Sequence, residues 1–254
     1  MKKINFSIIA HIDHGKSTLA DRMMEISSAV QKRKISQQML DTLNVEKQRG
    51  ITVKSQTVRL IHEHKGEKFA LNLIDTPGHV DFSFEVKRAL AACEGAIVLI
   101  DATQGIEAQT IANVYKALEE EVELLPVLNK IDLPSANVES VTEQIQNVLG
   151  IEIPPVSVSA KTGKGVKELL DAIVENMPIA GNQTQEPFQA LLIDSWFDKY
   201  LGVILLVRVF KGKITLNEEF KFYSKNTSYK VEKLGYLKPE IEYKEELSAG
   251  DVGI

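Results

Sequence analysis

A nine-residue stretch near the N-terminus, Ala10-His11-Ile12-Asp13-His14-Gly15-Lys16-Ser17-Thr18, constrains the fold more than any other part of the chain. It follows a short apolar run, Ile4 to Ile9, and precedes a segment whose apolar residues recur at helical spacing. Strand, tight loop, Gly-Lys-Ser and helix are the layout of a phosphate-binding loop, in which backbone N–H groups and a helix N-terminus surround a phosphate. Lys16 adds a positive charge for the terminal phosphates, and the Ser17 hydroxyl can reach Mg²⁺. The generic motif begins with glycine where this chain has Ala10, so the assignment needs support from elsewhere.

The first two-thirds of the chain alternates short apolar runs with segments of helical periodicity. This alternation predicts an α/β fold, a mostly parallel sheet with helices on both faces. The expected strands are Asn5–Ala10, Phe69–Ile74, Ala96–Asp101, Leu124–Asn129 and Pro155–Ser159. The expected helices are Lys16–Ser28, Phe82–Cys93, Gln104–Glu121, Val138–Leu149 and Val166–Asn176. Ligands of such sheets bind beyond the carboxyl ends of the strands, so the loops that follow strands are where we expect the chemistry.

A hairpin is an alternative for part of this region. Thr57–His62 and Phe69–Ile74 flank a polar turn around Gly66, which is a typical hairpin arrangement. His62 and His64 border the same turn, and we expect both side chains to be exposed to solvent.

The pattern changes at residues 177–187, where two prolines, a glycine and polar residues indicate a linker. Beyond it, short alternating segments predict a small antiparallel β-barrel domain. The expected strands there are Gln189–Trp196, Val203–Phe210, Glu219–Tyr223 and Tyr229–Leu234. The last residues, 249–254, resemble the start of another strand, so we expect an incomplete, truncated barrel. The predicted domains are residues 1–182 and 187–254.

Charge and cysteine content narrow the class of protein. A net charge of −5 argues against holding nucleic acid mainly through a broad basic surface, although docking on an RNA particle through local contacts remains open. Cys93 is the only cysteine, which fits a reducing cytosol and a packing role. No run approaches the roughly 20 apolar residues of a membrane span, and the N-terminus lacks a signal-peptide pattern. We therefore expect a cytoplasmic protein.

A second informative stretch, Asp75-Thr76-Pro77-Gly78-His79, directly follows an expected strand. An acidic residue at this strand end can hold Mg²⁺ directly or through its water shell. Gly78 leaves its backbone N–H free to approach a γ-phosphate. Thr-Pro-Gly is also ordinary turn chemistry, so the functional interpretation depends on the phosphate loop. His79 comes directly after Asp-Thr-Pro-Gly, the stretch beside which we expect the attacking water. The near-neutral pKa of histidine suits a residue at that position.

Two further stretches at strand ends indicate a base-binding site. In Asn129-Lys130-Ile131-Asp132, the carboxylate can accept two parallel hydrogen bonds from guanine N1–H and its 2-amino group, a pair that adenine lacks. Asn129 would tie the loop together, and the Lys130 stem can cover the base plane. Ser159-Ala160-Lys161 would donate backbone hydrogen bonds to the guanine O6. Asp132 therefore disfavours an ATP-using kinase.

A fifth stretch, Arg49-Gly50-Ile51-Thr52, lies in a charged region that runs from Gln31 to Lys54. The Thr52 hydroxyl can reach Mg²⁺ and its backbone the γ-phosphate, which predicts a loop ordered by a triphosphate. A solvated charged loop is the alternative for the flanking residues. The five stretches occur in one order, each at a strand end or in a loop, and this joint occurrence indicates a GTP-binding (G) domain. A metal site at His11 and His14 is disfavoured because no further ligand cluster lies nearby.

The phosphate loop, Arg49–Thr52 and Asp75–His79 together resemble the translational GTPases. Within that superfamily, three more stretches resemble the elongation factor 4 (LepA) family, namely residues 17–22, Leu90-Ala91-Ala92-Cys93-Glu94-Gly95-Ala96 and Asp194-Ser195-Trp196-Phe197-Asp198-Lys199-Tyr200-Leu201-Gly202. The resemblance covers essentially all 254 residues. The family carries alanine at the position of Ala10. Its members continue well beyond residue 254, so we expect the G domain and part of the second domain.

The resemblance implies roles for individual residues. It implies Mg²⁺ ligation by Ser17, Thr52 and Asp75, a catalytic His79 that positions water, and an apolar gate of Ile12 and Ile51 beside it. A monovalent cation near Asp13 is a further implied feature. The implied nucleotide-binding residues are Asp13, His14, Gly15, Lys16, Ser17, Thr18, Gly78, Asn129, Lys130, Asp132, Ser159, Ala160 and Lys161.

The resemblance also implies a ribosome-dependent GTP hydrolase of translation elongation, proposed in this family to back-translocate or remobilise stalled ribosomes. Its expected partners are GTP and GDP, the 70S ribosome with its large-subunit RNA, and tRNA through domains outside this chain. We expect a monomer without a DNA partner, cytoplasmic or peripheral on the cytoplasmic face of the membrane. The alternatives are another ribosomal factor, of the elongation factor G or BipA type, and a GTP-binding switch with little catalysis of its own.

Overall fold

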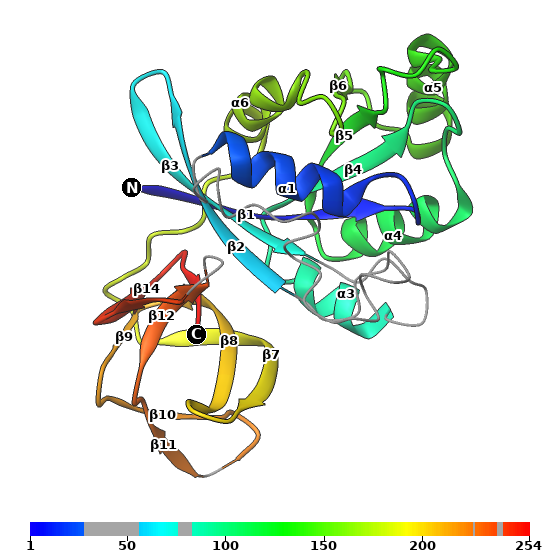
Figure 1. Cartoon of the computed structure of the whole chain (residues 1–254). Helices are drawn as coiled ribbons and strands as arrows, with labels where there is room; N and C mark the ends of the chain where they lie inside the picture. Colours follow the sequence, from blue (N-terminus) through cyan, green and yellow to red (C-terminus); the bar gives the residue numbers. More distant parts are fainter. Residues whose placement is uncertain (28–55, 76–82, 226, 238–240) are drawn as a thin grey trace.

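A computed structural model describes residues 1–27, 56–75, 83–225, 227–237 and 241–254 of the chain (Figure 1). A six-stranded sheet forms the first domain, in the order β2-β3-β1-β4-β5-β6. All neighbours pair in parallel except β2 and β3, which form an antiparallel hairpin. The strands are β1 (Lys2–Ala10), β2 (Gln56–His64), β3 (Glu67–Asp75), β4 (Gly95–Asp101), β5 (Glu123–Asn129) and β6 (Val156–Ser157). The predicted mostly parallel sheet is therefore confirmed. The hairpin that the sequence offered as an alternative is also present, as β2 and β3 at one edge of this sheet.

Helices cover both faces of this sheet because the buried strands are apolar on both sides. In β4, Ile97 and Leu99 point to one face, while Val98 and Ile100 point to the other. The first face packs against α1 (Lys16–Ile26) and α6 (Val166–Asn176). The second packs against α3 (Ser83–Leu90), α4 (Ala108–Glu119) and α5 (Val138–Gln144), which continues into a π-helical turn, η3 (Ile145–Leu149). The sheet therefore has the two-sided core that the strand–helix alternation predicts.

The second domain consists of short antiparallel strands around a separate core. Its longest hairpin joins β7 (Gln189–Asp198) to β8 (Gly202–Lys211), and β15 (Val252–Gly253) pairs with the other edge of β8. The remaining strands are β9 (Lys213–Thr215), β10 (Glu219–Lys221), β11 (Ser228–Lys230), β12 (Leu234–Leu237), β13 (Ile241–Lys244) and β14 (Glu246–Ser248). One buried core cluster of this domain consists of Val209, Ile214, Val231, Leu234 and Leu247.

One strand prediction in this domain is wrong. The sequence predicts a single strand over Tyr229–Leu234, whereas β11 ends at Lys230 and β12 begins at Leu234. Val231 turns inward between them, where its N–H donates to the carbonyl of Glu218 and its side chain joins the domain core. The break therefore places two strand segments in different sheets.

A polar and apolar interface joins the two domains. Asp251, which is 1% exposed, lies 2.8 Å from Lys3 Nζ and 3.1 Å from Arg59 Nη1, and it accepts a hydrogen bond from the Tyr236 hydroxyl. Glu94 accepts hydrogen bonds from Asn5 and Arg208, and Arg88 donates to the carbonyl of Ile193. An apolar cluster of Ile74, Ala89, Ala92, Ile193, Leu206 and Val252 lies beside them, with Cys93 and Trp196 packed against it. We call these residues the domain interface.

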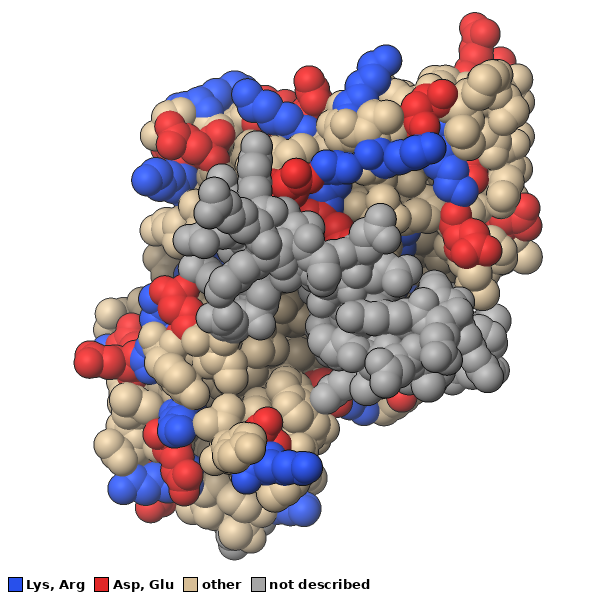
Figure 2. All heavy atoms as spheres, viewed as in Figure 1, with Lys and Arg blue, Asp and Glu red and all other residues tan. Residues whose placement is uncertain are grey.

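The surface agrees with the modest net charge. On the face seen in Figure 2, basic and acidic side chains are interspersed over both domains. Among the described residues, no helix combines the length and apolar composition needed to cross a membrane.

Candidate nucleotide-binding site

The phosphate loop connects the carboxyl end of β1 to the first turn of α1. Its backbone is left-handed at Asp13 (φ 64°) and at Gly15 (φ 93°), the residue before the helix. A Cβ added to Gly15 would lie 2.5 Å from Nδ2 of Asn129, so both the backbone angle and the space require glycine here. The loop therefore presents backbone N–H groups at the N-terminus of α1, which is the geometry that attracts a phosphate.

Asn129 connects three loops of the site. Its Nδ2 donates to the carbonyl of His14 over 2.9 Å, and its Oδ1 accepts the N–H of Ala160 over 3.0 Å. The side chain is buried, so both of its polar ends are used in bridging the phosphate loop to the loop after β6. The expected tie between loops is present.

Lys16 and Asp75 meet at the centre of this edge of the sheet. Lys16 Nζ lies 3.2 Å from Oδ1 of Asp75, whose side chain is 1% exposed. Asp75 is the last residue of β3, which pairs directly with β1, so strand pairing brings the carboxylate to the phosphate loop. The partly buried Ser17 hydroxyl and the Asp75 carboxylate are hard oxygen donors of the kind that Mg²⁺ prefers.

The carboxylate predicted to bind the base is exposed. A hydrogen bond from the buried Ser159 hydroxyl, and then the charge of Lys161, hold the pKa of Asp132 below its usual value. Lys161 is exposed beside it, and Ala160 is buried. Asp132 therefore remains an acceptor at neutral pH, open to a ligand from solvent.

Lys130 has a structural partner at the end of the neighbouring strand, β4. Its backbone is left-handed (φ 63°), and its Nζ lies 2.7 Å from Oδ2 of the fully buried Asp101. Burial by itself would raise the pKa of Asp101, but hydrogen bonds from Lys130 and Thr103 outweigh that effect and lower it. The pair holds the Lys130 stem across the end of β4 and β5.

His14 is fully buried beneath the phosphate loop. Its Nδ1 lies 3.3 Å from the backbone nitrogen of Asp101 and 3.4 Å from the carbonyl oxygen of Leu99. Burial lowers the pKa of His14, which keeps the ring neutral. The neutral ring supports the loop from within rather than facing a phosphate from solvent.

Arg22 is a site residue that the sequence reasoning missed. From α1, its Nε donates to the carbonyl of Ala160 over 3.2 Å and its Nη2 to that of Lys161 over 2.9 Å. Arg22 therefore holds the loop after β6 from the opposite side to Asn129. Its position two turns into a helix gave no signal, because an arginine there is typical of a solvated helix face.

The remaining predicted residues fall into two groups. Asp13 and Thr18 are exposed, and Ile12 is partly buried, all in the phosphate loop or the first turn of α1. Ile51, Thr52, Gly78 and His79 lie outside the described residues.

The prediction that His62 and His64 are exposed is wrong. Their side chains are only 8% and 13% exposed, because α6 packs over the end of the hairpin. Both rings contact Asp171 of α6.

The phosphate loop, Asp75 and the two base-side loops define the class of protein as a P-loop nucleotide-binding fold. The sequence matches the family described as the elongation factor Tu GTP binding domain over residues 1–179. The chain belongs to this family.

Individual relatives support the narrower resemblance to elongation factor 4. Proteins of that name from Campylobacter lari and Campylobacter concisus are 52% and 53% identical over 257 residues, covering 100% of this chain and 43% of each relative. The Mesoplasma florum protein of the same name is 52% identical over 252 residues, covering 98% of this chain and 42% of the relative. The chain thus spans about two-fifths of the length of these relatives. The predicted family resemblance is confirmed.

Solved structures share the fold at low sequence identity. A crystal structure of a Thermus thermophilus protein has a TM-score of 0.79 at 16% identity, covering 99% of this chain and 52% of that one. A bacterial selenocysteine-specific elongation factor has a TM-score of 0.77 at 22% identity, covering 100% and 42%. Both likenesses extend over the sheet domain and the antiparallel domain together.

Proposed function

We propose that this chain binds and hydrolyses GTP as part of a ribosome-dependent translational GTPase. The observation that carries the proposal is the convergence of three loops and one strand end at one edge of the sheet. The phosphate loop, Asp75, the Asn129–Asp132 loop and the Ser159–Lys161 loop meet there, connected by the hydrogen bonds of Asn129. Residues 1–182 form the nucleotide-binding domain in this proposal, and residues 187–254 belong to a second domain that docks on the partner.

Each residue in the proposed site has a chemical role. The N-terminus of α1, with Lys16, binds the β- and γ-phosphates, and Ser17 and Asp75 hold Mg²⁺ together with Thr52. The metal, when bound, neutralises charge that develops on the phosphates. Asp132 accepts the two guanine N–H groups, and the backbone of the Ser159–Lys161 loop donates to the guanine O6. His79 positions the attacking water, with Ile12 and Ile51 controlling its approach.

The ribosome is the proposed activator. Positioning and charge stabilisation dominate phosphoryl transfer, so a domain that lacks a partner's contribution hydrolyses GTP slowly. The relatives' name supports a role in elongation, and the family resemblance supports remobilisation of stalled ribosomes as that role. A cytoplasmic location, with peripheral contact to the membrane, is part of the same proposal.

A substitution at Asp132 tests the guanine assignment. Asp132→Asn reverses the polarity of two hydrogen bonds at the base, so affinity for GDP should fall about 100-fold or more while affinity for xanthosine diphosphate rises. Fluorescent GDP and xanthosine diphosphate analogues measure both affinities. Glu152→Gln, an exposed carboxylate at the opposite edge, serves as control and should change neither. Unchanged GDP affinity in Asp132→Asn would refute the assignment.

A substitution at His79 tests ribosome-stimulated catalysis. The assay uses a chimera in which the remaining residues of the Campylobacter lari relative follow Ile254, so that the docking domains are present. His79→Ala should retain GDP binding and lose at least 100-fold of the turnover stimulated by 70S ribosomes, since the loss of a positioned general base or water-orienting group costs about that much. Equal stimulation of both proteins would remove His79 from the mechanism and favour a switch with little catalysis of its own.

A further inference from the structure

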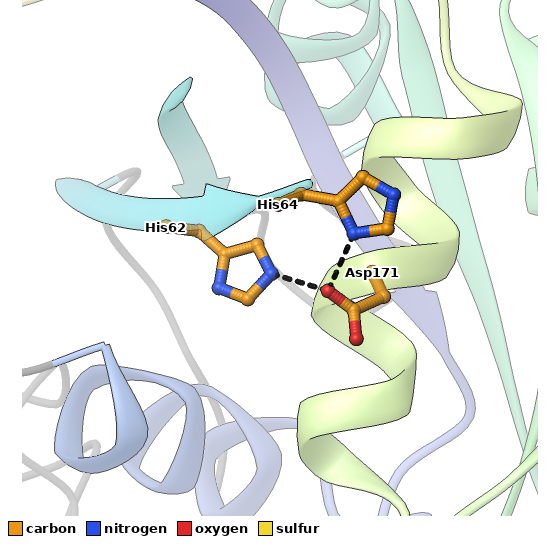
Figure 3. A group of neighbouring side chains, drawn as sticks. All are labelled: His62, His64 and Asp171. Carbon is orange, nitrogen blue, oxygen red and sulfur yellow. Dashed lines mark hydrogen bonds and ion pairs between the residues drawn. The ribbon is translucent and has the colours of Figure 1, made fainter. Parts of the chain in front are cut away.

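A cluster of metal-ligating side chains lies at the hairpin end of the sheet, away from the nucleotide site (Figure 3). His62 and His64 point from β2 towards Asp171 on α6. Nε2 of His62 lies 2.7 Å from Oδ1 of Asp171, and Nδ1 of His64 lies 2.8 Å from the same oxygen. His62 pairs with Phe69, six residues before Asp75, so roughly 20 Å of strand separates the cluster from the nucleotide edge.

The secondary structure explains why these side chains converge. Residues two apart on a strand point to the same face, so both imidazoles face α6 while Glu63 between them is exposed. On α6, Asp171 and Glu175 are one turn apart and lie on the same helix face. The cluster is therefore fixed by two regular elements rather than by a loop.

The donor atoms have the chemistry and the spacing of a transition-metal site. One ligating atom from each of His62, His64 and Asp171 lies within 4.8 Å of the other two. A tetrahedral ion with bonds of about 2.0–2.2 Å separates its ligand atoms by roughly 3.4 Å, so small side-chain rotations would admit the ion. Two imidazoles and one carboxylate with a fourth position for water form a known type of Zn²⁺ site.

The position of the carboxylate also suits a cation. Oδ1 of Asp171 lies within hydrogen-bond distance of one ring nitrogen of each histidine, so the three donor atoms already converge on one point. An ion bound between the three residues would replace these two contacts with direct ligation.

Glu175 orients one of the ligands. Nε2 of His64 lies 3.1 Å from Oε1 of Glu175, which also accepts a hydrogen bond from Lys65 over 2.7 Å. When the second ring nitrogen donates to a carboxylate, the first is left as the unprotonated, more basic ligand. The arrangement thus selects Nδ1 of His64 for the metal.

We propose that His62, His64 and Asp171 form a binding site for a zinc-class divalent transition-metal ion, with Glu175 as a positioning residue. The bound ion links β2 to α6 and so holds α6 against the end of the hairpin. The site is independent of the proposed nucleotide site, because it shares no residue with it.

Zinc titration of the full 254-residue chain tests the proposal. The protein is stripped of metal and saturated with GDP and Mg²⁺, so that the nucleotide site does not compete, and Zn²⁺ binding is measured calorimetrically. One Zn²⁺ per chain should bind, and the melting temperature should rise with it. Co²⁺ in place of Zn²⁺ should give the visible absorption of a low-coordinate nitrogen and oxygen site, which Zn²⁺ then abolishes.

Variants separate the site from other zinc-binding groups. His64→Ala and Asp171→Asn should weaken Zn²⁺ binding more than 100-fold, whereas Glu175→Gln should weaken it about 10–100-fold. Glu63→Gln, the exposed carboxylate between the histidines, is the matched control and should bind as the parent does. Circular dichroism of each metal-free variant confirms that it is folded.

Three results would overturn the proposal. The first is the absence of stoichiometric Zn²⁺ binding at tens of micromolar protein. The second is equal affinity in Asp171→Asn, His64→Ala and the parent. The third is binding that survives these substitutions but is lost in His11→Ala, which would assign the ion to the phosphate loop instead.

Discussion

The two ends of β1 carry polar groups that are used in opposite ways. At the amino end, Lys3 lies in the domain interface with Arg59 and Asp251, where charged groups are buried against one another. At the carboxyl end, the phosphate loop lies beside the exposed carboxylate of Asp132. One strand of nine residues thus connects a buried charge cluster between two domains to an edge that also carries an exposed carboxylate.

This difference indicates what each end is for. Buried charges that are paired fix one arrangement of neighbouring elements, since an unpaired partner would be costly. At the nucleotide edge, neutral hydrogen bonds of Asn129 connect the loops, and the exposed Asp132 carboxylate remains open to a ligand. The comparison predicts that substitutions at the interface affect stability, and that those at the nucleotide edge affect affinity.

The largest expected effect is at the domain interface. Asp251→Ala leaves Lys3 and Arg59 without their carboxylate, and breaking a buried ion pair in this way costs about 3–5 kcal/mol. Trp196, the only tryptophan, packs against the interface cluster, so its fluorescence in urea reports the free energy of unfolding. GDP affinity of the folded variant should stay close to that of the parent.

An exposed ion pair at the same end of β1 is the matched control. Lys2 and Glu67 lie 2.6 Å apart, but their side chains are 50% and 59% exposed. Glu67→Gln should therefore leave the free energy of unfolding close to that of the parent. A loss in Asp251→Ala no greater than that in Glu67→Gln would show that the interface charges contribute little to stability.

Asn129→Ala should have an intermediate effect, and we expect it to lower the affinity for GDP. It leaves the carbonyl of His14 and the N–H of Ala160 without their partner, at about 1–3 kcal/mol for each buried group. GDP affinity should fall about 30-fold or more, since the lower bound for the two groups together is about 2 kcal/mol and every 1.4 kcal/mol is a factor of ten. Fluorescent GDP binding measures it. If the variant instead loses stability and keeps its affinity, the contrast between the two ends of β1 would fail.

The smallest expected effect is the pH dependence of the interface. Burial by itself would raise the pKa of Asp251, but Lys3, Ser248 and Arg59 outweigh it and lower the pKa in the folded protein. The unfolded carboxyl, with a pKa of about 3.9, therefore takes up its proton first as the solution is acidified. The contribution of Asp251 is complete at neutral pH and declines as pH falls below about 4 towards the lower folded-state pKa.

Comparison with Asp251→Asn isolates this contribution from other carboxylates. Urea unfolding at a series of pH values between 7 and 3 should show the stability advantage of the parent shrinking only at the acid end. An advantage that is constant over the whole range would mean that the Asp251 carboxylate is not the group responsible.

Local patterns predicted the nucleotide edge because each of its loops directly follows a strand. Parallel pairing of β1, β3, β4 and β5 then brings the strand ends together, so Asp75 and Asn129 meet the phosphate loop without further information. The family resemblance added roles, not positions. Arg22 was missed because its partners are backbone carbonyls in a loop 138 residues or more away.

The domain interface and the histidine cluster could not be predicted from local patterns. Asp251 is 192 residues from Arg59, and each is typical of a solvated surface when considered alone. The Gly66 turn favoured exposed histidines, but packing of α6 over the hairpin decided otherwise. Strands of two or three residues, such as β9 and β15, are too short for alternation to be recognised.

Cys93 makes the domain interface directly observable. Its thiol donates to the carbonyl of Ala89 over 3.1 Å within the interface cluster, and burial raises its pKa well above the ordinary value. Alkylating reagents attack the thiolate, so this cysteine reacts slowly while the two domains are closed together. Because it is the only cysteine, the alkylation rate of the unmodified chain reports how often the domains separate, and nucleotide can be added to the same assay.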